Sequence, residues 1–473
     1  MTVLTRHVAL VGFMGAGKTS VGEEVALRIG LPFRDVDREV ELSLSTSIAG
    51  FFATEGEEAF RVREAAKTVQ ALREPQPAVL ALGGGAVTQQ PVREALREHA
   101  VTVLLDVDAQ TAWQRVEGSD RPLAQERAAF LALFDQRAPL YREVADSVGR
   151  DADDVVLVAA GVHVETGALE RLGALVPGDG PAALVSDSHV AGIHGMDAQL
   201  ALGSRLAETH ELPPGEEAKT LAALDRLWQE LRIDRRGTIV ALGGGCTTDA
   251  AGFAAAAYLR GVPWTPVPTS LVAQVDAAIG GKTAIDLPQG KNLVGAFHWP
   301  ARTIVDPALL QTLPEAQRLE GLAEVVKTGL LAAEPLWELP DGELVRRCAA
   351  FKAAVCLRDP HDRGERAMLN LGHTFAHALE AGARYGGVTH GQAVALGLVA
   401  ALRLSGRDPG AVEEILRPRP VRADRELAWQ AMRRDKKSVD GELRLVLLSD
   451  EGPRWNVPVP AADARRELDA LIA

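Results

Sequence analysis

The first residues that could carry chemistry lie close to the amino terminus. Gly12-Phe13-Met14-Gly15-Ala16-Gly17-Lys18-Thr19 joins an apolar run, residues 7–11, to a helical pattern, residues 20–29. This is the spacing of a phosphate-binding loop, in which glycines let the backbone wrap a polyphosphate and amide dipoles supply positive potential. The lysine can reach the outer phosphates, and the threonine can ligate magnesium. The sequence therefore predicts a nucleoside triphosphate site formed by Gly15, Ala16, Gly17, Lys18, Thr19 and Ser20.

Two further features of the first third of the chain could contact a substrate. Asp35 and Asp37 stand two residues apart, and in an extended segment they would project to the same side. One could serve magnesium and the other could accept a hydrogen bond from a substrate hydroxyl. Gly83-Gly84-Gly85 ends an apolar run and removes every side chain between the backbone and a ligand. The alternatives are an acid pair on a solvated loop and a plain tight turn.

The second half of the chain contains a different glycine turn. Gly243-Gly244-Gly245 follows a strand-like run, residues 238–242, but its spacing is not that of the dinucleotide fingerprint. Asp187 ends an earlier apolar run, where an acid could bind an adenosine ribose. A stretch of cationic and small residues follows, and lysines in glycine-rich loops indicate phosphate and carboxylate ligands more than a solvated surface. For any single lysine, a place on the solvated surface is the competing interpretation. Its members are Arg260, Thr269, Ser270, Asp276, Gly280, Gly281, Lys282, Lys291 and Asn292.

Metal chemistry is indicated further along. Residues 366, 370, 373 and 377 fall on one face of a predicted helix, and His390 and Glu324 lie in separate segments. One carboxylate and two imidazoles would leave an open coordination position, as a catalytic zinc requires. A structural role for a buried histidine is the competing interpretation.

Length and composition limit the number of domains and the classes of partner that these sites can belong to. A chain of 473 residues is too long for one ordinary domain and predicts two or three. No apolar stretch reaches membrane-spanning length and no export signal opens the chain, so we expect a cytoplasmic protein without a membrane partner. The net charge of −13 argues against nucleic acid as a partner. Cys246, Cys348 and Cys356 lack the spacing of a zinc finger or a disulfide framework.

The elements that must position the first site alternate between strand and helix. Strand-like runs at residues 8–11, 78–82 and 101–107 predict a parallel sheet with right-handed crossovers. Residues 163–173 read as a strand, a turn and a helix that open a new fold, so the boundary is expected near residues 159–162.

Taken together, residues 7–160 resemble shikimate kinase. The phosphate-binding loop, the Asp35/Asp37 pair, Ser47-Ile48-Ala49 leading to residues 57–61, the Gly83 triplet, Arg121-Pro122-Leu123 and Arg137-Ala138-Pro139-Leu140-Tyr141 occur in the family's order. By position, the resemblance implies that shikimate is held by Asp37, Arg61, Gly84, Gly85 and Arg137. It implies that Thr19 and Asp35 place magnesium, that Arg121 closes a lid over ATP, and that Lys18, Asp37 and Arg121 act in catalysis.

Residues 163–473 resemble 3-dehydroquinate synthase, through stretches 276–283, 290–297, 321–329, 369–380 and 390–397. The resemblance implies a zinc site, able also to take cobalt, formed by Glu324, His373 and His390. It implies an NAD site formed by Asp187, Glu216, Lys219, Gly244, Gly245, Asp249, Thr269 and Ser270. It implies catalytic roles for Lys327 and His377, and heptulosonate phosphate contacts from Arg260, Asp276, Lys282, Lys291, Asn292, Lys327, Lys352, Arg366, Asn370, His377 and Lys436. Arg260 is expected to reach in from a neighbouring subunit of a homodimer. The chain departs from the family's usual pattern at Cys246-Thr247-Thr248, Thr328, Pro360 and Gln392.

The predicted organisation is thus a P-loop kinase parallel-sheet domain, residues 1–160, and a synthase, residues 161–473. The synthase is expected to combine an α/β NAD-binding part, residues 161–310, with a mainly helical metal-binding part, residues 311–473. The resemblances imply ATP-dependent phosphorylation of shikimate, and NAD- and zinc-dependent conversion of 3-deoxy-D-arabino-heptulosonate 7-phosphate to 3-dehydroquinate and phosphate. The alternatives are a related sugar-phosphate cyclase or a metal-dependent alcohol dehydrogenase in the second half, and a degenerate kinase acting as an ATP sensor in the first.

Overall fold

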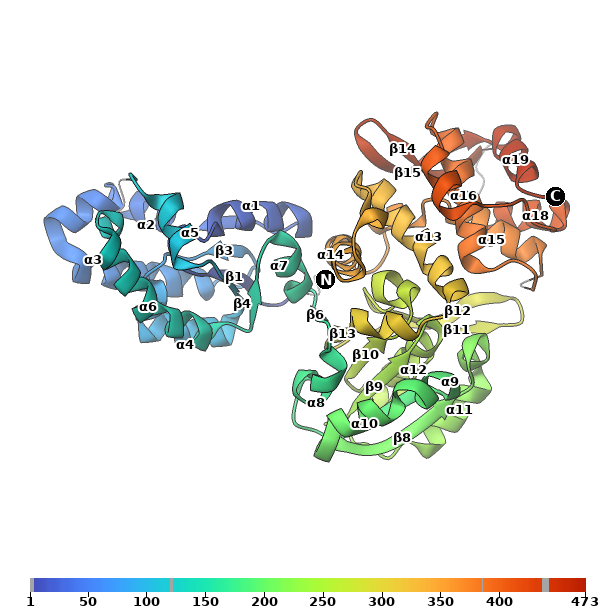
Figure 1. Ribbon diagram of the computed structural model, residues 1–473, viewed down its shortest axis with the longest axis horizontal. Coiled ribbons are helices and arrows are strands. Elements are labelled where there is room, and N and C mark those ends of the chain that lie inside the picture. The colour runs from blue at the N-terminus through green and yellow to red at the C-terminus, as the bar shows by residue number, and fades with distance from the viewer. Residues whose placement is uncertain (1–3, 120–121, 385, 436–441) are drawn as a thin grey trace. The chain divides into compact units, whose positions relative to one another are not determined.

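The computed structural model describes residues 4–119, 122–384, 386–435 and 442–473. The chain divides into two compact units, Met1–Ala160 and Gly161–Ala473 (Figure 1). Arg121 and Lys436, which were predicted to contact ligands, lie outside the described residues. Within the described ranges, no helix is both long enough and apolar enough to cross a membrane.

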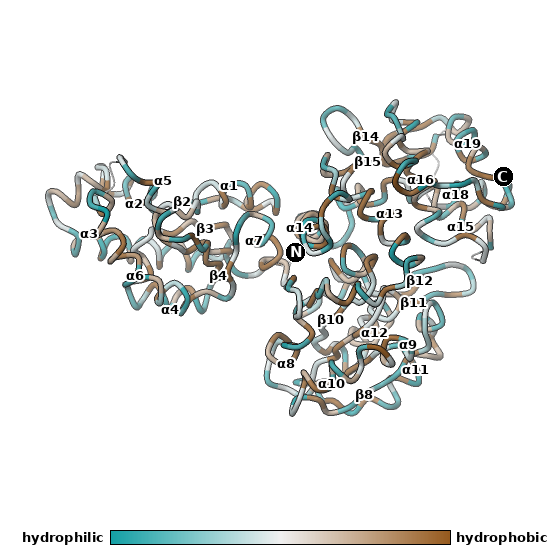
Figure 2. Tube along the Cα trace, viewed as in Figure 1, coloured by the Kyte–Doolittle hydropathy of each residue, from teal (hydrophilic) through white to brown (hydrophobic). Residues whose placement is uncertain are grey.

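The first unit is built on a five-stranded parallel sheet of order β2-β3-β1-β4-β5. All residues of β1 and β3 are buried, as expected for strands covered by helices on both faces. Figure 2 shows the corresponding apolar residues along the middle of this sheet. The strands are β1 (His7–Val11), β2 (Phe33–Asp35), β3 (Val79–Ala81), β4 (Ala100–Leu105) and β5 (Ser147–Gly149).

Helices α1 and α7 contact each other, whereas α4 contacts α3 and α6 (Figure 1). Gly56 has a left-handed φ of 84° inside α3, which breaks that helix ahead of Glu57. The predicted α/β class with a parallel sheet is therefore confirmed for this unit. The helices are α1 (Lys18–Ile29), α2 (Val36–Leu44), α3 (Ile48–Leu72), α4 (Gln90–His99), α5 (Ala109–Val116), α6 (Arg127–Val144) and α7 (Ala152–Ala159).

The second unit begins with a four-stranded parallel sheet of order β10-β9-β7-β8. Its central strands β7 and β9 are buried along their whole length. The strands of this part are β6 (Val162–Val164), β7 (Ala182–Asp187), β8 (Leu206–Leu212), β9 (Thr238–Gly243), β10 (Trp264–Pro268), the hairpin β11 (Lys282–Leu287) and β12 (Gly290–Phe297), and β13 (Thr303–Val305). The helices are α8 (Leu172–Leu175), α9 (Ser188–Val190), α10 (Met196–Leu202), α11 (Leu221–Glu230) and α12 (Gly245–Ala257).

The remainder of the second unit is mainly helical, as predicted. Its core contains Phe375, Leu379, Val394 and Leu398 from two adjacent helices, together with Leu445 from a terminal hairpin. The elements are α13 (Glu315–Ala332), α14 (Asp341–Arg358), α15 (His373–Gly382), α16 (His390–Leu404), α17 (Gly410–Leu416), α18 (Arg425–Asp435), β14 (Glu442–Ser449), β15 (Gly452–Pro460) and α19 (Ala461–Ala470).

The prediction of one continuous helix through residues 366–377 is wrong. A 3-10 helix spans Glu365–Asn370, and α15 begins only at His373. Gly372 separates them with a left-handed φ of 78°, and an added Cβ there would meet Leu398 N at 2.8 Å. A glycine-specific conformation in close contact with α16 therefore interrupts the helical pattern.

Candidate active sites

The phosphate-binding loop connects β1 to α1 at the carboxyl edge of the first sheet. Gly12, Gly15 and Gly17 have φ of 148°, 85° and 88°, a region that side-chain-bearing residues rarely adopt. Lys18 Nζ donates to the carbonyls of Gly12 and Phe13 at 2.8 and 3.1 Å, so the lysine lies over the loop. The loop has the curled backbone and the cation that a polyphosphate needs.

The predicted magnesium pair lies beside this loop. Thr19 Oγ1 donates to Asp35 Oδ2 at 2.7 Å, which brings the threonine hydroxyl and a carboxylate to one point. The prediction that Asp35 and Asp37 share one side of an extended segment is wrong. Asp35 ends β2 and caps α2, accepting from Arg38 N at 3.2 Å, whereas Asp37 lies in the first turn of that helix. The two acids therefore diverge into different parts of the same site.

The glycine triplet after β3 is packed against charged side chains. A Cβ on Gly83 would lie 2.3 Å from Asp37 Oδ1, and one on Gly85 would lie 2.0 Å from Arg61 Nη1. The carbonyl of Gly84 accepts from Arg137 Nη1 at 3.3 Å. The structure thus gathers the five predicted shikimate ligands in one place.

Two acids that sequence reasoning missed hold these arginines. Glu57 Oε1 lies 2.9 Å from Arg61 Nη2 and 3.7 Å from Arg137 Nη2, and Glu64 Oε2 lies 2.7 Å from Arg61 Nη1. Burial lowers the pKa of Arg137, and the nearby Arg61 lowers it further. Burial would also lower the pKa of Arg61, but Glu64 and Glu57 outweigh it and the pKa is raised. Both guanidinium groups remain charged and face an open cavity of about 1090 Å³ that Thr19, Asp35 and Asp37 also line.

A second cavity, of about 530 Å³, lies at the carboxyl edge of the second sheet. Because Ser186 pairs with Leu242, and Pro268 with Gly243, the ends of β7, β9 and β10 meet at this edge, where ligands bind in open α/β sheets. Five of the predicted NAD ligands line the cavity: Asp187, Gly244, Gly245, Thr269 and Ser270.

Asp187 is buried and held in one orientation. Its Oδ1 accepts from the backbone of His189 and Val190 at 3.1 and 3.0 Å, and its Oδ2 accepts from Thr247 Oγ1 at 2.9 Å. Thr247 is one of the departures from the family pattern, and here it fixes the acid that was predicted to bind the ribose.

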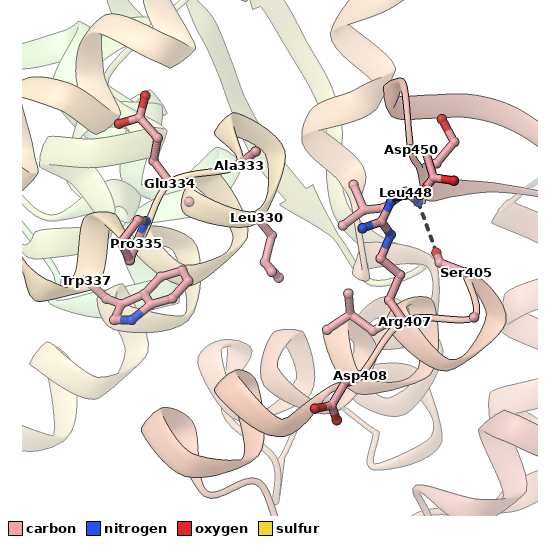
Figure 3. Close-up of a pocket in the computed structure, with 14 residues that line it drawn as sticks. Leu330, Ala333, Glu334, Pro335, Trp337, Ser405, Arg407, Asp408, Leu448 and Asp450 are labelled. Atoms are coloured by element: carbon pink, nitrogen blue, oxygen red, sulfur yellow. Dashed lines mark hydrogen bonds and ion pairs between the residues drawn. The ribbon is translucent and has the colours of Figure 1, made fainter.

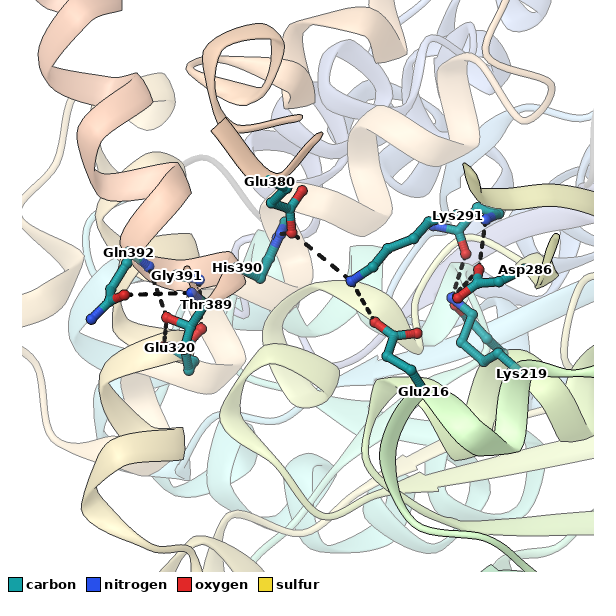
Figure 4. A network of polar contacts seen from close by, with 12 residues as sticks. Glu216, Lys219, Asp286, Lys291, Glu320, Glu380, Thr389, His390, Gly391 and Gln392 are labelled. Atoms are coloured by element: carbon teal, nitrogen blue, oxygen red, sulfur yellow. Dashed lines mark hydrogen bonds and ion pairs between the residues drawn. The ribbon is translucent and has the colours of Figure 1, made fainter. Parts of the chain in front are cut away.

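The other three predicted NAD ligands, Glu216, Lys219 and Asp249, take part in polar contacts, and Figure 4 shows the first two of them. Lys219 Nζ donates to Asp249 Oδ2 at 2.8 Å and contacts the side chain of Asn292. Lys291 Nζ donates to Glu216 Oε1 at 2.7 Å. Two predicted substrate residues, Lys291 and Asn292, therefore lie against the predicted nucleotide residues.

The predicted metal ligands converge from three helices. Glu324 on α13 and His373 and His390, the first residues of α15 and α16, present ligand atoms that all lie within 4.8 Å of one another. Glu324 Oε1 is 3.4 Å from His373 Nε2 and 3.3 Å from His390 Nε2. His377, one turn beyond His373, has its ring centroid 5.7 Å from that of His373 and is exposed.

The protonation of this cluster fits a divalent cation. Burial would raise the pKa of Glu324, but Lys327 and His373 hold it well below the ordinary value. Burial and Lys327 lower the pKa of His373, which leaves its ring nitrogen available as a ligand. Against burial, Glu324 and Glu380 raise the pKa of His390 to about 10. A cation bound to one carboxylate and two imidazoles would replace the proton on His390.

A buried acid and two lysines stand next to the cluster. Asp276 contacts the amines of Lys352 and Lys327, the latter at 4.0 Å, and Lys327 also pairs with Glu324. Burial would raise the pKa of Asp276, but the two lysines outweigh it and lower the pKa. Arg366 is 2% exposed and donates to the carbonyls of Gly280 and Pro360, while its Nε has no hydrogen-bond partner in the described part of the chain. These cations can hold a polar, anionic substrate.

Three further residues, Lys282, Asn370 and Arg260, were predicted to contact the substrate. Lys282 pairs with Asp362 at 2.5 Å, and Asn370 ends the 3-10 helix ahead of α15. Arg260 is exposed on the turn after α12, and its side chain makes no ion pair with any described residue. Its role in a neighbouring subunit stays a prediction.

A further open cavity, of about 970 Å³, contains none of the predicted residues (Figure 3). Trp337 and Leu330 line one wall, and Arg407, paired with Asp450 at 2.8 Å, lines the other. Its charged residues are solvent-exposed, so it does not have the buried, convergent polar groups of the other sites.

Comparison with known proteins agrees with this geometry. The shikimate kinase family model matches residues 14–162, and the amino- and carboxyl-terminal models of 3-dehydroquinate synthase match residues 209–320 and 321–438. The chain is 39% identical over 343 residues to 3-dehydroquinate synthase from Bordetella pertussis, covering 65% of this chain and 95% of that protein.

Solved structures are also similar to parts of the chain. A 2-deoxy-scyllo-inosose synthase complexed with carbaglucose-6-phosphate, NAD+ and Co2+ is 27% identical, with a TM-score of 0.59 over 65% of this chain and 96% of its own. Shikimate kinase from Acinetobacter baumannii, in complex with shikimate, is 37% identical over 32% of this chain and 88% of its own, with a TM-score of 0.30. From the family models and the Bordetella relative, the chain belongs to the 3-dehydroquinate synthase family through its second unit and carries a shikimate kinase domain in its first.

Proposed function

We propose that the chain is a bifunctional enzyme of the shikimate pathway. The first unit phosphorylates shikimate to shikimate 3-phosphate with ATP and magnesium. The second converts 3-deoxy-D-arabino-heptulosonate 7-phosphate to 3-dehydroquinate and phosphate, using NAD and zinc or cobalt. The observation that carries the proposal is the presence, in one chain, of a complete phosphate-binding loop beside paired arginines and of a converged carboxylate–imidazole cluster beside buried lysines.

In the kinase unit, the positions and charges of the side chains support the following roles. Arg61 and Arg137 take the planar carboxylate of shikimate, for which forked guanidinium groups are suited. Asp37 lies beside Gly83, where it can accept a hydrogen bond from the hydroxyl that receives phosphate. Lys18 stabilises negative charge on the transferred phosphoryl group. The competing role of a passive ATP sensor would not need the arginine pair.

This arrangement predicts a selective effect of Gly85→Ala. The new Cβ would lie 2.0 Å from Arg61 Nη1, so the guanidinium must move away from its substrate position. Because a displacement of about 1 Å can cost about 10²-fold in rate, we expect kcat/KM for shikimate to fall by about that factor. The KM for ATP should be unchanged, since the phosphate-binding loop is not touched. Steady-state kinetics with each substrate varied in turn test this, and an unaltered kcat/KM for shikimate would remove Arg61 from the binding site.

In the synthase unit, the described side chains hold substrate and manage protons. Lys352 and Arg366 are buried cations that bind an anionic substrate, and Asp276 keeps Lys327 and Lys352 in place. The exposed His377, one helical turn from His373, can transfer a proton between substrate and solvent. When bound, NAD supplies a hydride acceptor and donor, and the metal ion polarises substrate oxygens.

The decisive test of this unit is the stoichiometry of NAD. Omitting NAD from stripped enzyme should abolish phosphate release from the heptulosonate phosphate. Substoichiometric NAD should support many turnovers without net NADH, because tightly held intermediates allow the hydride to return before product leaves.

Two outcomes would contradict the assignment. NADH accumulating one-for-one with product would identify an alcohol dehydrogenase. Equal phosphate release from a hexose 6-phosphate, used as the control substrate, would identify a related sugar-phosphate cyclase instead.

A further inference from the structure

Glu380 is a buried carboxylate to which neither the sequence analysis nor the proposed reaction assigns a role. It lies on α15, is 5% exposed, and places Oε1 at 3.4 Å from His390 Nδ1 (Figure 4). The opposite nitrogen of the same ring, Nε2, lies 3.3 Å from Glu324 Oε1 in the metal cluster. The two nitrogens of His390 therefore face two different carboxylates.

The backbone of His390 is already fixed by other contacts. Glu320 accepts from Thr389 Oγ1 and from Gly391 N, both at 2.5 Å, so it holds the residues on either side of His390. Gln392 and Thr389 form a capping box at the same helix start. The freedom that remains at His390 is rotation of its ring, which decides which nitrogen faces the cluster.

Glu380 is placed to fix that rotation. It lies seven residues after His373, on the same face of α15, so one helix brings both a ligand and the outer carboxylate to the site. Lys291 Nζ lies 4.0 Å from Glu380 Oε1 and 2.7 Å from Glu216 Oε1, which gives the buried carboxylate a second cationic neighbour. Within the described residues, the ligand atoms that come within 4.8 Å of one another belong to Glu324, His373 and His390, so Glu380 stands outside the ligand set.

We propose that Glu380 is a positioning residue that accepts the Nδ1–H of His390 and so directs Nε2 toward the metal ion. The inference rests on the proposed metal site and deepens it. A carboxylate on the far nitrogen fixes the tautomer and the orientation of a ligating imidazole and makes it a better donor. Lys291 links this outer carboxylate to Glu216, a predicted nucleotide ligand.

The test is the zinc affinity of the full chain, measured without substrates by competition with a chromophoric chelator. Loss of such an outer partner typically costs about 10- to 100-fold in metal affinity, and we expect that loss in Glu380→Ala. Glu380→Gln keeps an oxygen that can accept from Nδ1–H, so it should lose less. Glu413→Gln, which alters a carboxylate on α17 paired with Arg403, is the matched control and should bind zinc like the parent.

The outcomes separate this inference from the proposed function. Zinc affinity equal to that of the parent in both Glu380 variants, with affinity lost in His373→Ala, would overturn the role of Glu380 and leave the metal site standing. A parent that binds no zinc would overturn both. Thermal unfolding in chelator shows whether Glu380→Ala folds. If it does not fold, the zinc affinity of Glu380→Gln is compared with that of Glu413→Gln, and equal affinities refute the proposal.

Discussion

Lys18→Ala should abolish the phosphorylation of shikimate while leaving the synthase reaction intact. The amine lies over the phosphate-binding loop, where it would meet the charge that develops on the transferred phosphoryl group. Removing one such preorganised donor costs about 10² to 10³-fold in kcat, and we expect at least that loss. Production of ADP that depends on shikimate, and release of phosphate from heptulosonate phosphate, are measured on the same preparation.

The matched control is Lys67→Ala, which removes a lysine of the same unit that pairs with Glu39 at 3.5 Å. This variant should retain both activities. A comparable fall of both activities in folded Lys18→Ala would mean that the two units do not act separately, contrary to the proposal.

His373→Ala should have the opposite selectivity. His373 is 8% exposed, and its Nε2 faces Glu324 Oε1 at 3.4 Å, so its loss leaves a buried carboxylate with a single imidazole neighbour on the metal side. Since an outer partner alone is worth about 10- to 100-fold, loss of a ligand should weaken zinc by more than about 10²-fold and stop the synthase. Kinase activity should be unchanged. Metal content after dialysis and both assays check this.

In the parent protein, chelation should stop the synthase, and added zinc or cobalt should restore its activity. His163→Ala, which removes a histidine of β6 paired with Glu165, is the control and should keep its zinc. Equal zinc content in His373→Ala and the parent would exclude His373 from the site.

The local parts of both sites could be predicted from the sequence. The phosphate-binding loop depends on contiguous residues, because glycine at set positions permits its backbone path whatever the rest of the chain does. In the turn after β9, Gly243 instead leaves room for Thr247, whose Cβ an added Cβ would meet at 2.6 Å. The residue types of Glu324, His373 and His390 indicated a metal site, and the resemblance to a family assigned these three residues as its ligands. Periodicity alone placed residues 366–377 on one helix and missed the break at Gly372, which is set by contact with α16.

The acids that hold site arginines and a site imidazole in place could not be predicted from the sequence. Glu57, Glu64 and Glu380 look like surface acids in the sequence, and acids are seldom fully buried unless paired. Glu64 and Glu380 are 1% and 5% exposed here because folding brings each beside a cation or an imidazole. The sequence signal that could have pointed to Glu57 is Gly56 immediately before it, because the helix breaks at this glycine.

The most direct test of the central claim is to assay one purified preparation of the chain for both reactions. The proposal predicts ADP formation that requires shikimate and magnesium, and phosphate release from heptulosonate phosphate that requires NAD and a divalent metal, each proceeding without the other's substrates. Absence of either activity from folded protein supplied with its metal and cofactor would contradict the assignment of two enzymes to this chain.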